Sequence, residues 1–391
     1  MRMISLVIIN MYKEFIGSIE YVAGAALDGV AGLLNYGKGE MASAPSDGKI
    51  TLPDDLFAQP DAQTEWWYYT GHCKTKTGRE FGFELVFFKR RTDRDRIGVV
   101  PLTALANPMY FAHFAISDIT LGKFRYEHKR SFGTPLEAPV KMSADAYDIS
   151  FGDWSIREIA GSHILHATFD DGTVFDAILR SEKPAVPNGD NGDGLSKKKD
   201  GTSKHFSFTR MSAQGQLTTA SGIDTFGGSA WMDREYGAWE QGGGWDWFSI
   251  QFDDNSELMI YQFQDETGTM QGKSTGTFVA PDGTCTYLIR KDFEIEPLSY
   301  WTSENTKATY PASWKVSVPS LDINCEVASL IGDQELDTRG STMVVYWEGA
   351  CSVRGTRSGS EVGGRAYVEL VGYDRSHESV GLVDFLFGGI R

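Results

Sequence analysis

The chain changes character at Thr51, where it becomes a succession of short strand-like runs. Runs such as 81–89 and 110–118 are rich in aromatic and apolar residues, and Gly, Asp or Asn, which favour turns, lie between many of the runs. Residues 163–169 and 173–179 are expected to form a hairpin over a turn at 170–172. No helical pattern longer than about three turns occurs after residue 50. Together with the 43 Gly of the chain, this pattern predicts an all-β fold.

The run 81–89 (FGFELVFFK) indicates the kind of sheet to expect. Successive side chains of a strand point to opposite faces of its sheet. One face of this run would carry Phe81, Phe83, Leu85 and Phe87, and the other Gly82, Glu84, Val86 and Phe88. Both faces are partly apolar, which fits the wall of a barrel that is covered on its outer side.

A chain of 391 residues is long enough for two domains. One set of strand-like runs is followed by a second set that begins near Phe248. Two consecutive sets of mostly antiparallel strands fit two barrels or sandwiches packed together. We therefore predict a helical segment and linker at 1–50, a first β domain at 51–226 and a second β domain at 227–391.

The first 50 residues differ from the rest of the chain. Residues 16–34 place their apolar side chains on one helical stripe, but several Gly weaken such a helix on its own. We expect this segment to pack on the protein, or to contact a membrane surface or a partner. The apolar run 3–9 is too short to span a membrane and matches a signal peptide poorly. We expect a cytoplasmic protein, with peripheral membrane contact and export left open as alternatives.

The composition argues against several classes of partner. A formal net charge of -16 opposes binding to nucleic acid, because phosphates repel an acidic surface, and it equally opposes electrostatic docking on anionic lipid. The four Cys are too few for a disulfide scaffold, and neither they nor the seven His follow a metal-ligand spacing. No phosphate-binding Gly loop and no Ser nucleophile elbow occurs in the sequence. We therefore expect no nucleic acid partner, no metal and no cofactor.

The stretch Gly227–Phe248 concentrates chemically useful groups, because it holds four of the ten Trp residues together with several carboxylates and an Arg. On a strand, Trp231, Asp233 and Glu235 would share a face, and Arg234 would point to the other. Aromatic walls beside carboxylates suit a pocket in which an apolar substrate meets an acid.

Such a pocket suits the addition of a proton to an alkene. That step needs a carboxyl group that stays neutral near about pH 7, and an apolar pocket provides it by raising the pKa. Trp and Tyr rings stabilise the cation that follows by roughly 0.5–2 kcal/mol each. We predict Glu235 or Asp233 as the acid. The predicted aromatic walls are Trp231, Trp245, Trp247 and Trp66.

The alternative is that Asp233 or Glu235 forms an ion pair with Arg234 or with a neighbouring strand. An Arg beside a carboxylate lowers the pKa of that carboxylate and spoils it as an acid. If Arg234 contacted Asp233, Glu235 would be the better proton donor.

Three further side chains, Glu65, His113 and Tyr261, are candidates. Glu65 precedes two Trp and would either line the pocket as an acid or bind a loop. Trp66 and Trp67 face opposite ways, so at most one of them lines a given cavity. His113 lies in an apolar strand, as a general base or water-orienting group or as a hydrogen-bonded core residue. Tyr261 lies in an aromatic strand and would line the pocket or belong to the core.

A series of short motifs resembles one known family. The motifs are Glu65–Tyr68, Thr70–His72, Ala112–Phe114, Lys183–Pro184, Gly189–Gly192, Ala230–Glu235, Trp245–Trp247, Asp333–Leu336 and Tyr346–Ala350. Together they look like the AttH family, relatives of the carotenoid 1,2-hydratases (hydroxyneurosporene synthases), over roughly residues 50–375. One departure is Ser229, two positions before Trp231, where the hydratases have a His.

The resemblance implies two tandem lipocalin-like β-barrels and chemistry on isoprenoids or polyenes. We therefore predict a cofactor-independent enzyme that protonates an alkene, leading to hydration or cyclisation, in an aromatic-lined pocket. The alternative is a lipocalin-like carrier that binds a hydrophobic small molecule without changing it.

Overall fold

A computed structural model describes residues 45, 47–93, 95–97, 100–104, 106–133, 137–189, 191–198, 201–239, 243–265, 268–269 and 272–374. Within these residues the helices are short 3-10 turns at Asp54–Leu56 (η1), Leu102–Ala104 (η2), Arg290–Asp292 (η3) and Pro319–Leu321 (η4). The remaining regular elements are strands, which confirms the all-β prediction. The predicted helix and membrane contact at 16–34 lie outside the described residues. The described part of the chain contains no helix with the length and apolarity needed to cross a membrane.

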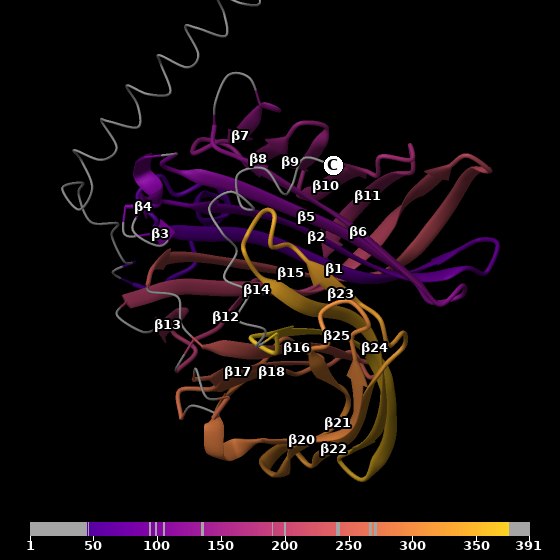
Figure 1. The fold of residues 1–391 in the computed structure, drawn as a ribbon. Coiled ribbons are helices and arrows are strands. Elements are labelled where there is room, and N and C mark those ends of the chain that lie inside the picture. Colours follow the sequence, from indigo (N-terminus) through magenta and orange to yellow (C-terminus); the bar gives the residue numbers. More distant parts are fainter. Residues whose placement is uncertain are drawn as a thin grey trace, which may run out of the picture.

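The first antiparallel sheet curls into a nearly closed barrel (Figure 1). Its strands follow the order β6-β5-β2-β1-β15-β14-β11-β10-β9-β8-β7, with β12 and β13 paired to β14. The strands are β1 Thr64–Thr75, β2 Glu80–Arg90, β5 Met109–Asp118, β6 Lys123–Ser131, β7 Val140–Met142, β8 Asp148–Phe151, β9 Trp154–Ile159, β10 Ser162–Thr168, β11 Val174–Ser181, β12 Val186–Pro187, β13 Leu195–Lys198, β14 Gly201–Thr219 and β15 Gly222–Ala238. A short ribbon of β3 Arg96–Ile97 and β4 Val100–Pro101 lies apart from this sheet.

The second antiparallel sheet is a curled half-barrel with the order β19-β18-β17-β16-β25-β24-β22-β21-β20, and β23 pairs with β24. The strands are β16 Gly244–Phe252, β17 Glu257–Gln264, β18 Thr275–Val279, β19 Cys285–Ile289, β20 Glu294–Thr302, β21 Thr309–Val318, β22 Ile323–Ser329, β23 Glu335–Asp337, β24 Val345–Arg357 and β25 Ser360–Val371. Two tandem antiparallel β units are thus confirmed, and the second is open where a closed barrel was predicted.

The predicted boundary between residues 226 and 227 falls inside β15. That strand pairs with β1 and β14 of the first sheet up to Ala238, and the second sheet begins at Gly244. The stretch Gly227–Phe248 therefore runs from one sheet into the other. Its first half belongs to the barrel wall and its second half to the half-barrel.

Strand β2 explains why both faces of the barrel wall are apolar. Phe81, Phe83 and Phe87 are fully buried in the core inside the barrel. Val86 on the opposite face is buried as well, because it packs in a second cluster with Trp247 and Tyr367 of the other sheet. The covered barrel wall predicted from 81–89 is therefore confirmed, and the second sheet is what covers it.

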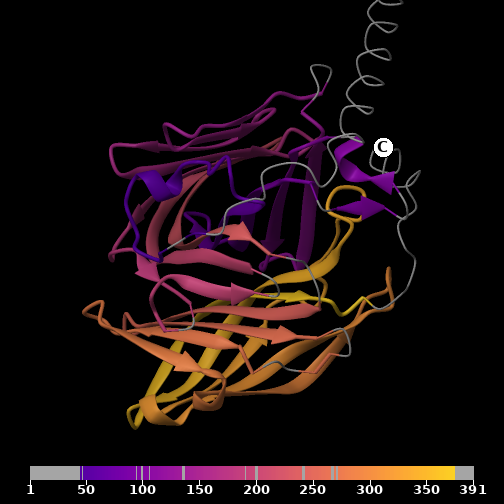
Figure 2. The same ribbon diagram turned by 90° about the vertical axis from the view of Figure 1, so that its left-hand side faces the viewer.

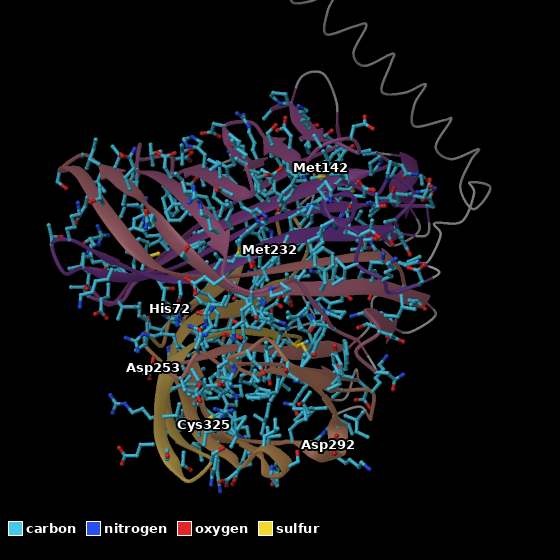
Figure 3. All side chains as sticks on the ribbon, turned by 180° about the vertical axis from the view of Figure 1, so that it is seen from behind. His72, Met142, Met232, Asp253, Asp292 and Cys325 are labelled. Carbon is cyan, nitrogen blue, oxygen red and sulfur yellow. The ribbon has the colours of Figure 1, made fainter. Side chains whose placement is uncertain are left out.

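The two sheets stack with strands β1, β2 and β15 against β16, β24 and β25 (Figures 1 and 2). His72, labelled in Figure 3, lies at this junction, and its Nε2 is 2.9 Å from the carbonyl oxygen of Ala366 on β25. Gly82 permits the close approach, since a Cβ at that position would lie only 2.8 Å from the Cβ of Ala350. The junction is therefore a tight interface, and the functional cavity opens within it.

Candidate active site

A cavity of about 380 Å³ lies between the two sheets. From the first sheet it is lined by Thr64, Trp66, Tyr68, Glu84, Phe88, Lys89, Arg90, Met109, Phe111, His113, His205, Asp233 and Glu235. From the second sheet it is lined by Trp245, Trp247, Tyr261, Tyr346, Glu369 and Val371. The connecting segments contribute Thr92, Asp95, Leu102, Thr342, Met343 and Val344. We call this space the inter-sheet cavity.

Four of the predicted aromatic residues line this cavity: Trp66, Trp245, Trp247 and Tyr261. Trp66 does so because β1 turns it outward, whereas its neighbour Trp67 is buried inside the barrel. The rings meet edge to face, with 6.4 Å between the centroids of Trp245 and Tyr261. Such an arrangement presents both faces and edges of electron-rich rings to a ligand.

Trp231 is a supporting residue outside the lining. Its ring packs edge to face on Trp247, with centroids 6.1 Å apart. Its indole Nε1 donates a hydrogen bond of 2.6 Å to Oδ1 of Asp233. Trp231 therefore orients one wall and one carboxylate of the cavity without lining it.

Asp233 is held by a polar group of partners. His205 Nε2 lies 2.9 Å from Asp233 Oδ2, and Ser207 donates to the other oxygen. Burial acts to lower the pKa of His205, but the charges of Asp233 and Glu235 outweigh it and raise that pKa. Nδ1 of His205 is buried and has no hydrogen-bond partner among the described residues.

Glu235 lines the cavity on the same face as Asp233, as the alternation predicted. Lys198 Nζ lies 2.7 Å from its Oε1 and 4.6 Å from the ring centroid of Tyr261. Burial acts to raise the pKa of Glu235, but the positive charges of Lys198 and His205 prevail and lower it. Glu235 is thus ionised near neutrality and does not meet the requirement predicted for the proton donor.

Arg234 and Glu65 lie on the other side of the wall. Arg234 Nη2 is 2.6 Å from Glu65 Oε2, and Lys89 Nζ is 2.5 Å from Glu65 Oε1. Glu65 also accepts a hydrogen bond from the backbone of Gln59. The structure therefore places Glu65 in a buried ion-pair network rather than in the cavity lining, which contradicts its predicted role as a pocket acid.

Glu84 is a buried carboxyl group whose pKa is raised, whereas the pKa of Glu235 is lowered. Glu84 is fully buried on the outward face of β2, lines the cavity and accepts a 3.0 Å hydrogen bond from the hydroxyl of Tyr346. Burial, assisted by the charge of Glu369, raises the pKa of Glu84 to about 8. Its Oε2 has no hydrogen-bond partner among the described residues. Glu84 is therefore a neutral carboxylic acid near pH 7, with one oxygen free.

Glu369 is the second acid of the cavity, and it comes from the other sheet. Its Oε2 accepts a 2.8 Å hydrogen bond from Nε1 of Trp245. Burial, with the charges of Asp233 and Glu235, raises the pKa of Glu369 to about 7. Glu369 is thus poised to lose or accept a proton close to neutrality.

Two further groups complete this end of the cavity. His113 Nδ1 lies 2.7 Å from the hydroxyl of Tyr346, and burial lowers the pKa of His113 well below its ordinary value. The hydroxyl of Tyr68, a lining residue, donates a 2.5 Å hydrogen bond to Glu348 behind the lining, and burial and the charge of Glu84 raise the pKa of Glu348. His113 is therefore neutral, and Glu84 and Glu348 favour their protonated forms.

Comparison with known proteins agrees with this architecture. The AttH-like family profile matches residues 43–373. This chain belongs to the AttH-like family. A solved AttH structure from Nitrosomonas europaea is 27% identical, with a TM-score of 0.74 over 85% of this chain and 99% of that one. Comparison with curated proteins found no match.

A second solved structure similar to this AttH-like protein is kievitone hydratase from Nectria haematococca. It is 16% identical, with a TM-score of 0.66 over 85% of this chain and 98% of that chain. At that identity the likeness shows a shared fold.

The described residues of the AttH-like protein contain no group of three or more His, Cys, Asp or Glu side chains placed to hold a metal ion. Cys73, Cys285, Cys325 and Cys351 are free thiols. The cavity itself presents carboxyl groups, imidazoles and aromatic rings.

Sequence reasoning missed Glu84, Glu369, Tyr346 and His205. For Glu84 a signal existed, because it is the one carboxylate in the apolar run 81–89. For Glu369 and His205 no comparable signal was available, since each lies in a strand with ordinary polar alternation.

Proposed function

We propose that this protein adds water across an isolated carbon–carbon double bond of an apolar small molecule held in the inter-sheet cavity. The observation that carries the proposal is a pair of carboxyl groups, Glu84 and Glu369, whose pKa values are raised to about 8 and about 7 on a wall of indole rings. The shared fold with a protein that is named a hydratase supports this class of reaction.

Glu84 is the proton donor in this proposal. The Tyr346 hydroxyl occupies Oε1, which leaves Oε2, buried and without a hydrogen-bond partner among the described residues, to carry the acidic proton. A donor pKa near the working pH is favourable, because the group is protonated and still acidic enough to transfer the proton. The proton forms a C–H bond at one alkene carbon, and the positive charge develops at the other.

The developing cation lies among aromatic rings. Trp66, Trp245, Trp247 and Tyr261 line the cavity, and cation–π attraction of roughly 0.5–2 kcal/mol per ring stabilises the charge. Lys198 shows that this wall accepts a cation, since its ammonium lies 4.8 Å from the ring centroid of Phe263 next to Tyr261. The rings thereby lower the barrier to alkene protonation.

Glu369 completes the reaction as the base. Its pKa of about 7 leaves a large fraction ionised near neutrality, and the carboxylate removes one proton from the water that attacks the cation. The new C–O bond forms as that O–H bond breaks. Glu84 has then lost one proton, Glu369 has gained one, and the product contains one added water.

The ligand is expected to be an isoprenoid or another polyene. A cavity of about 380 Å³ is in the range typical of small-molecule sites. Apolar side chains such as Leu102, Met109 and Phe111 line it together with the acids. A branched alkene would suit this environment because protonation then gives a tertiary cation.

The test is incubation of the purified protein with a panel of prenyl alcohols, prenylated phenols and linear polyenes in water labelled with oxygen-18. Mass spectrometry should detect a product that has gained one labelled water. Glu84→Gln and Glu369→Gln should each lower the rate at least about 100-fold, the usual scale for loss of a general acid or base.

Asp246→Asn is the matched control. Burial raises the pKa of Asp246 to about 7, but its carboxyl group bonds to Tyr373 and Gln264 outside the cavity lining. This variant should keep the activity. A product of unchanged mass would indicate cyclisation instead, and an apolar molecule that co-purifies unchanged through all variants would indicate a carrier.

A further inference from the structure

We propose that His128, Ser341, His113 and Tyr346 form a proton relay that connects solvent to Glu84. Its purpose rests on the proposed function, because it would restore the proton that Glu84 gives to the substrate. Its existence can be tested without any substrate.

The four groups make a continuous series of hydrogen bonds. His128 Nδ1 lies 2.8 Å from the Ser341 hydroxyl, which lies 3.4 Å from His113 Nε2. His113 Nδ1 lies 2.7 Å from the Tyr346 hydroxyl. That hydroxyl donates to Glu84 Oε1 at 3.0 Å. The series leads from a half-buried imidazole to a fully buried acid.

Neighbouring strands fix the geometry of this series. His128 on β6 is the register partner of His113 on β5, with ring centroids 6.3 Å apart. Tyr346 on β24 reaches across the junction of the sheets to both His113 and Glu84. Ser341 lies just before β24 and closes the gap between the two imidazoles. Both sheets therefore contribute members of the relay.

The protonation states suit proton transfer. Burial lowers the pKa of both His113 and His128, so each ring is neutral and has one nitrogen that accepts a proton. Burial raises the pKa of Tyr346, so its hydroxyl keeps a proton to donate. A neutral imidazole can accept a proton at one nitrogen and release another from the second.

The transfer balances as a shift of one hydrogen at each link. A proton from solvent binds His128, and His128 passes its Nδ1 proton to Ser341. Ser341 passes its proton to His113 Nε2, and His113 passes its Nδ1 proton to Tyr346. Tyr346 passes its hydroxyl proton to Oε1 of the Glu84 carboxylate, and a half-turn of the carboxyl group then brings that proton to the position of Oε2. The net change is one proton moved from solvent to Glu84, with each intermediate group left neutral.

The contact between the Ser341 hydroxyl and His113 Nε2, at 3.4 Å, is the longest in the series, so the orientation of this hydroxyl controls proton transfer. The Ser341 hydroxyl also lies 3.2 Å from the carbonyl oxygen of Thr338, which competes with His113 for the same hydrogen. Rotation of this hydroxyl from Thr338 to His113 completes the series. His128 and Ser341 lie outside the lining of the cavity, whereas His113 and Tyr346 belong to it.

The test follows the carboxyl proton of Glu84 directly. The protein is transferred rapidly into heavy water at about pH 6, below the folded pKa of Glu84, where its carboxyl group is protonated. Time-resolved infrared spectroscopy then records the shift of the carboxyl C=O band as hydrogen is replaced by deuterium. The bands of Glu84 and Glu369 are assigned by their loss in Glu84→Gln and Glu369→Gln.

We expect His113→Phe and Tyr346→Phe to slow exchange at Glu84 at least tenfold and to leave exchange at Glu369 unchanged. Glu369 is the internal control, because it shares the cavity but bonds to Trp245 instead of to the relay. A purely structural role of His113 would alter both bands together or neither. Equal exchange at Glu84 in wild type and both variants would overturn the relay.

Ser341→Ala and His128→Gln are a second, independent test of the relay. Both changes leave the Tyr346–Glu84 bond in place, and His128 is only half-buried. Each should slow exchange at Glu84 alone. If the variants slow exchange at Glu84 but the wild-type protein shows no hydration activity, the relay stands and the proposed function is rejected. If the wild-type protein hydrates a substrate but the variants do not slow exchange at Glu84, the proposed function stands and the relay is rejected.

Discussion

At the scale of single residues, the main feature is the burial of acids that have no cation beside them. Glu235 and Glu65 each face a cation, Lys198 and Arg234 respectively, and such partners favour the ionised form. Glu84 instead faces a hydroxyl and a second acid, Glu348. The same residue type therefore serves as a fixed charge in one place and stays a neutral acid near about pH 7 in another.

Glu84→Gln should change how stability depends on pH. The folded pKa of Glu84, about 8, lies above the ordinary value of 4.5, so the folded state holds a proton that the unfolded state loses between these values. Wild-type stability therefore falls as pH rises through this window. The variant lacks that loss, so its stability relative to wild type should rise by on the order of 5 kcal/mol by about pH 9. Urea unfolding at a series of pH values measures this difference.

Glu80→Gln is the control on the same strand. The hydrogen bond and charge of Lys74, opposed by slight burial, lower the pKa of Glu80, so ionised Glu80 favours the folded state above its ordinary pKa. Its replacement should bring no gain at alkaline pH. An alkaline gain of the same size in both variants would mean that Glu84 is not the origin of the effect.

At the scale of strands, the alternation of side chains between the two faces of a strand was the most reliable signal in the sequence. It predicted the two apolar faces of β2, the shared face of Asp233 and Glu235, and the outward turn of Trp66. It could not assign the acid, because a pKa depends on what faces the carboxyl group. The partner of Glu235 is a Lys on β13, and that of Glu84 is a Tyr on β24, 262 positions away in the chain.

Strand β2 also needs Gly82 for its contact with the second sheet. In Gly82→Ala the new Cβ would lie 2.8 Å from the Cβ of Ala350 and 3.0 Å from the hydroxyl oxygen of Tyr367, closer than side chains normally approach. We expect a loss of roughly 1–3 kcal/mol from overpacking, measured as a lower urea midpoint.

Gly227→Ala on β15 is the matched change. A Cβ there would meet its nearest atom at 3.9 Å, an ordinary contact. It should leave the midpoint nearly unchanged. If both variants lost the same stability, the cost would come from the strand backbone and not from the sheet contact.

At the scale of the whole molecule, the two sheets are joined by a buried ionic link beside the apolar contacts. Glu257 on β17 of the second sheet is fully buried. It lies 2.5 Å from Arg210 Nε on β14 and 2.8 Å from Lys183 Nζ, both of the first unit. Arg210 and Lys183 also bond to backbone carbonyl groups of the second unit. This link fixes how one sheet lies on the other.

Glu257→Gln should weaken that link strongly. It removes the negative charge and leaves two largely buried cations, Arg210 and Lys183, without it, for which a loss of about 3–5 kcal/mol is expected. Differential scanning calorimetry should show a lower midpoint or two separate transitions. Glu326→Gln, at an exposed position of the same sheet, should leave the trace unchanged. A trace for Glu257→Gln that matches wild type would show that apolar packing alone holds the sheets.

The two carboxyl groups of the cavity are contributed by different sheets, Glu84 by β2 and Glu369 by β25. The distance between these two carboxyl groups therefore depends on how the two sheets pack against each other. Neither sheet determines it alone. Substitutions far from either acid can retune that spacing by sliding one half by a fraction of an ångström. A protein built in this way can change the shape of its cavity through substitutions at the contact between its sheets, while Glu84 and Glu369 themselves stay the same.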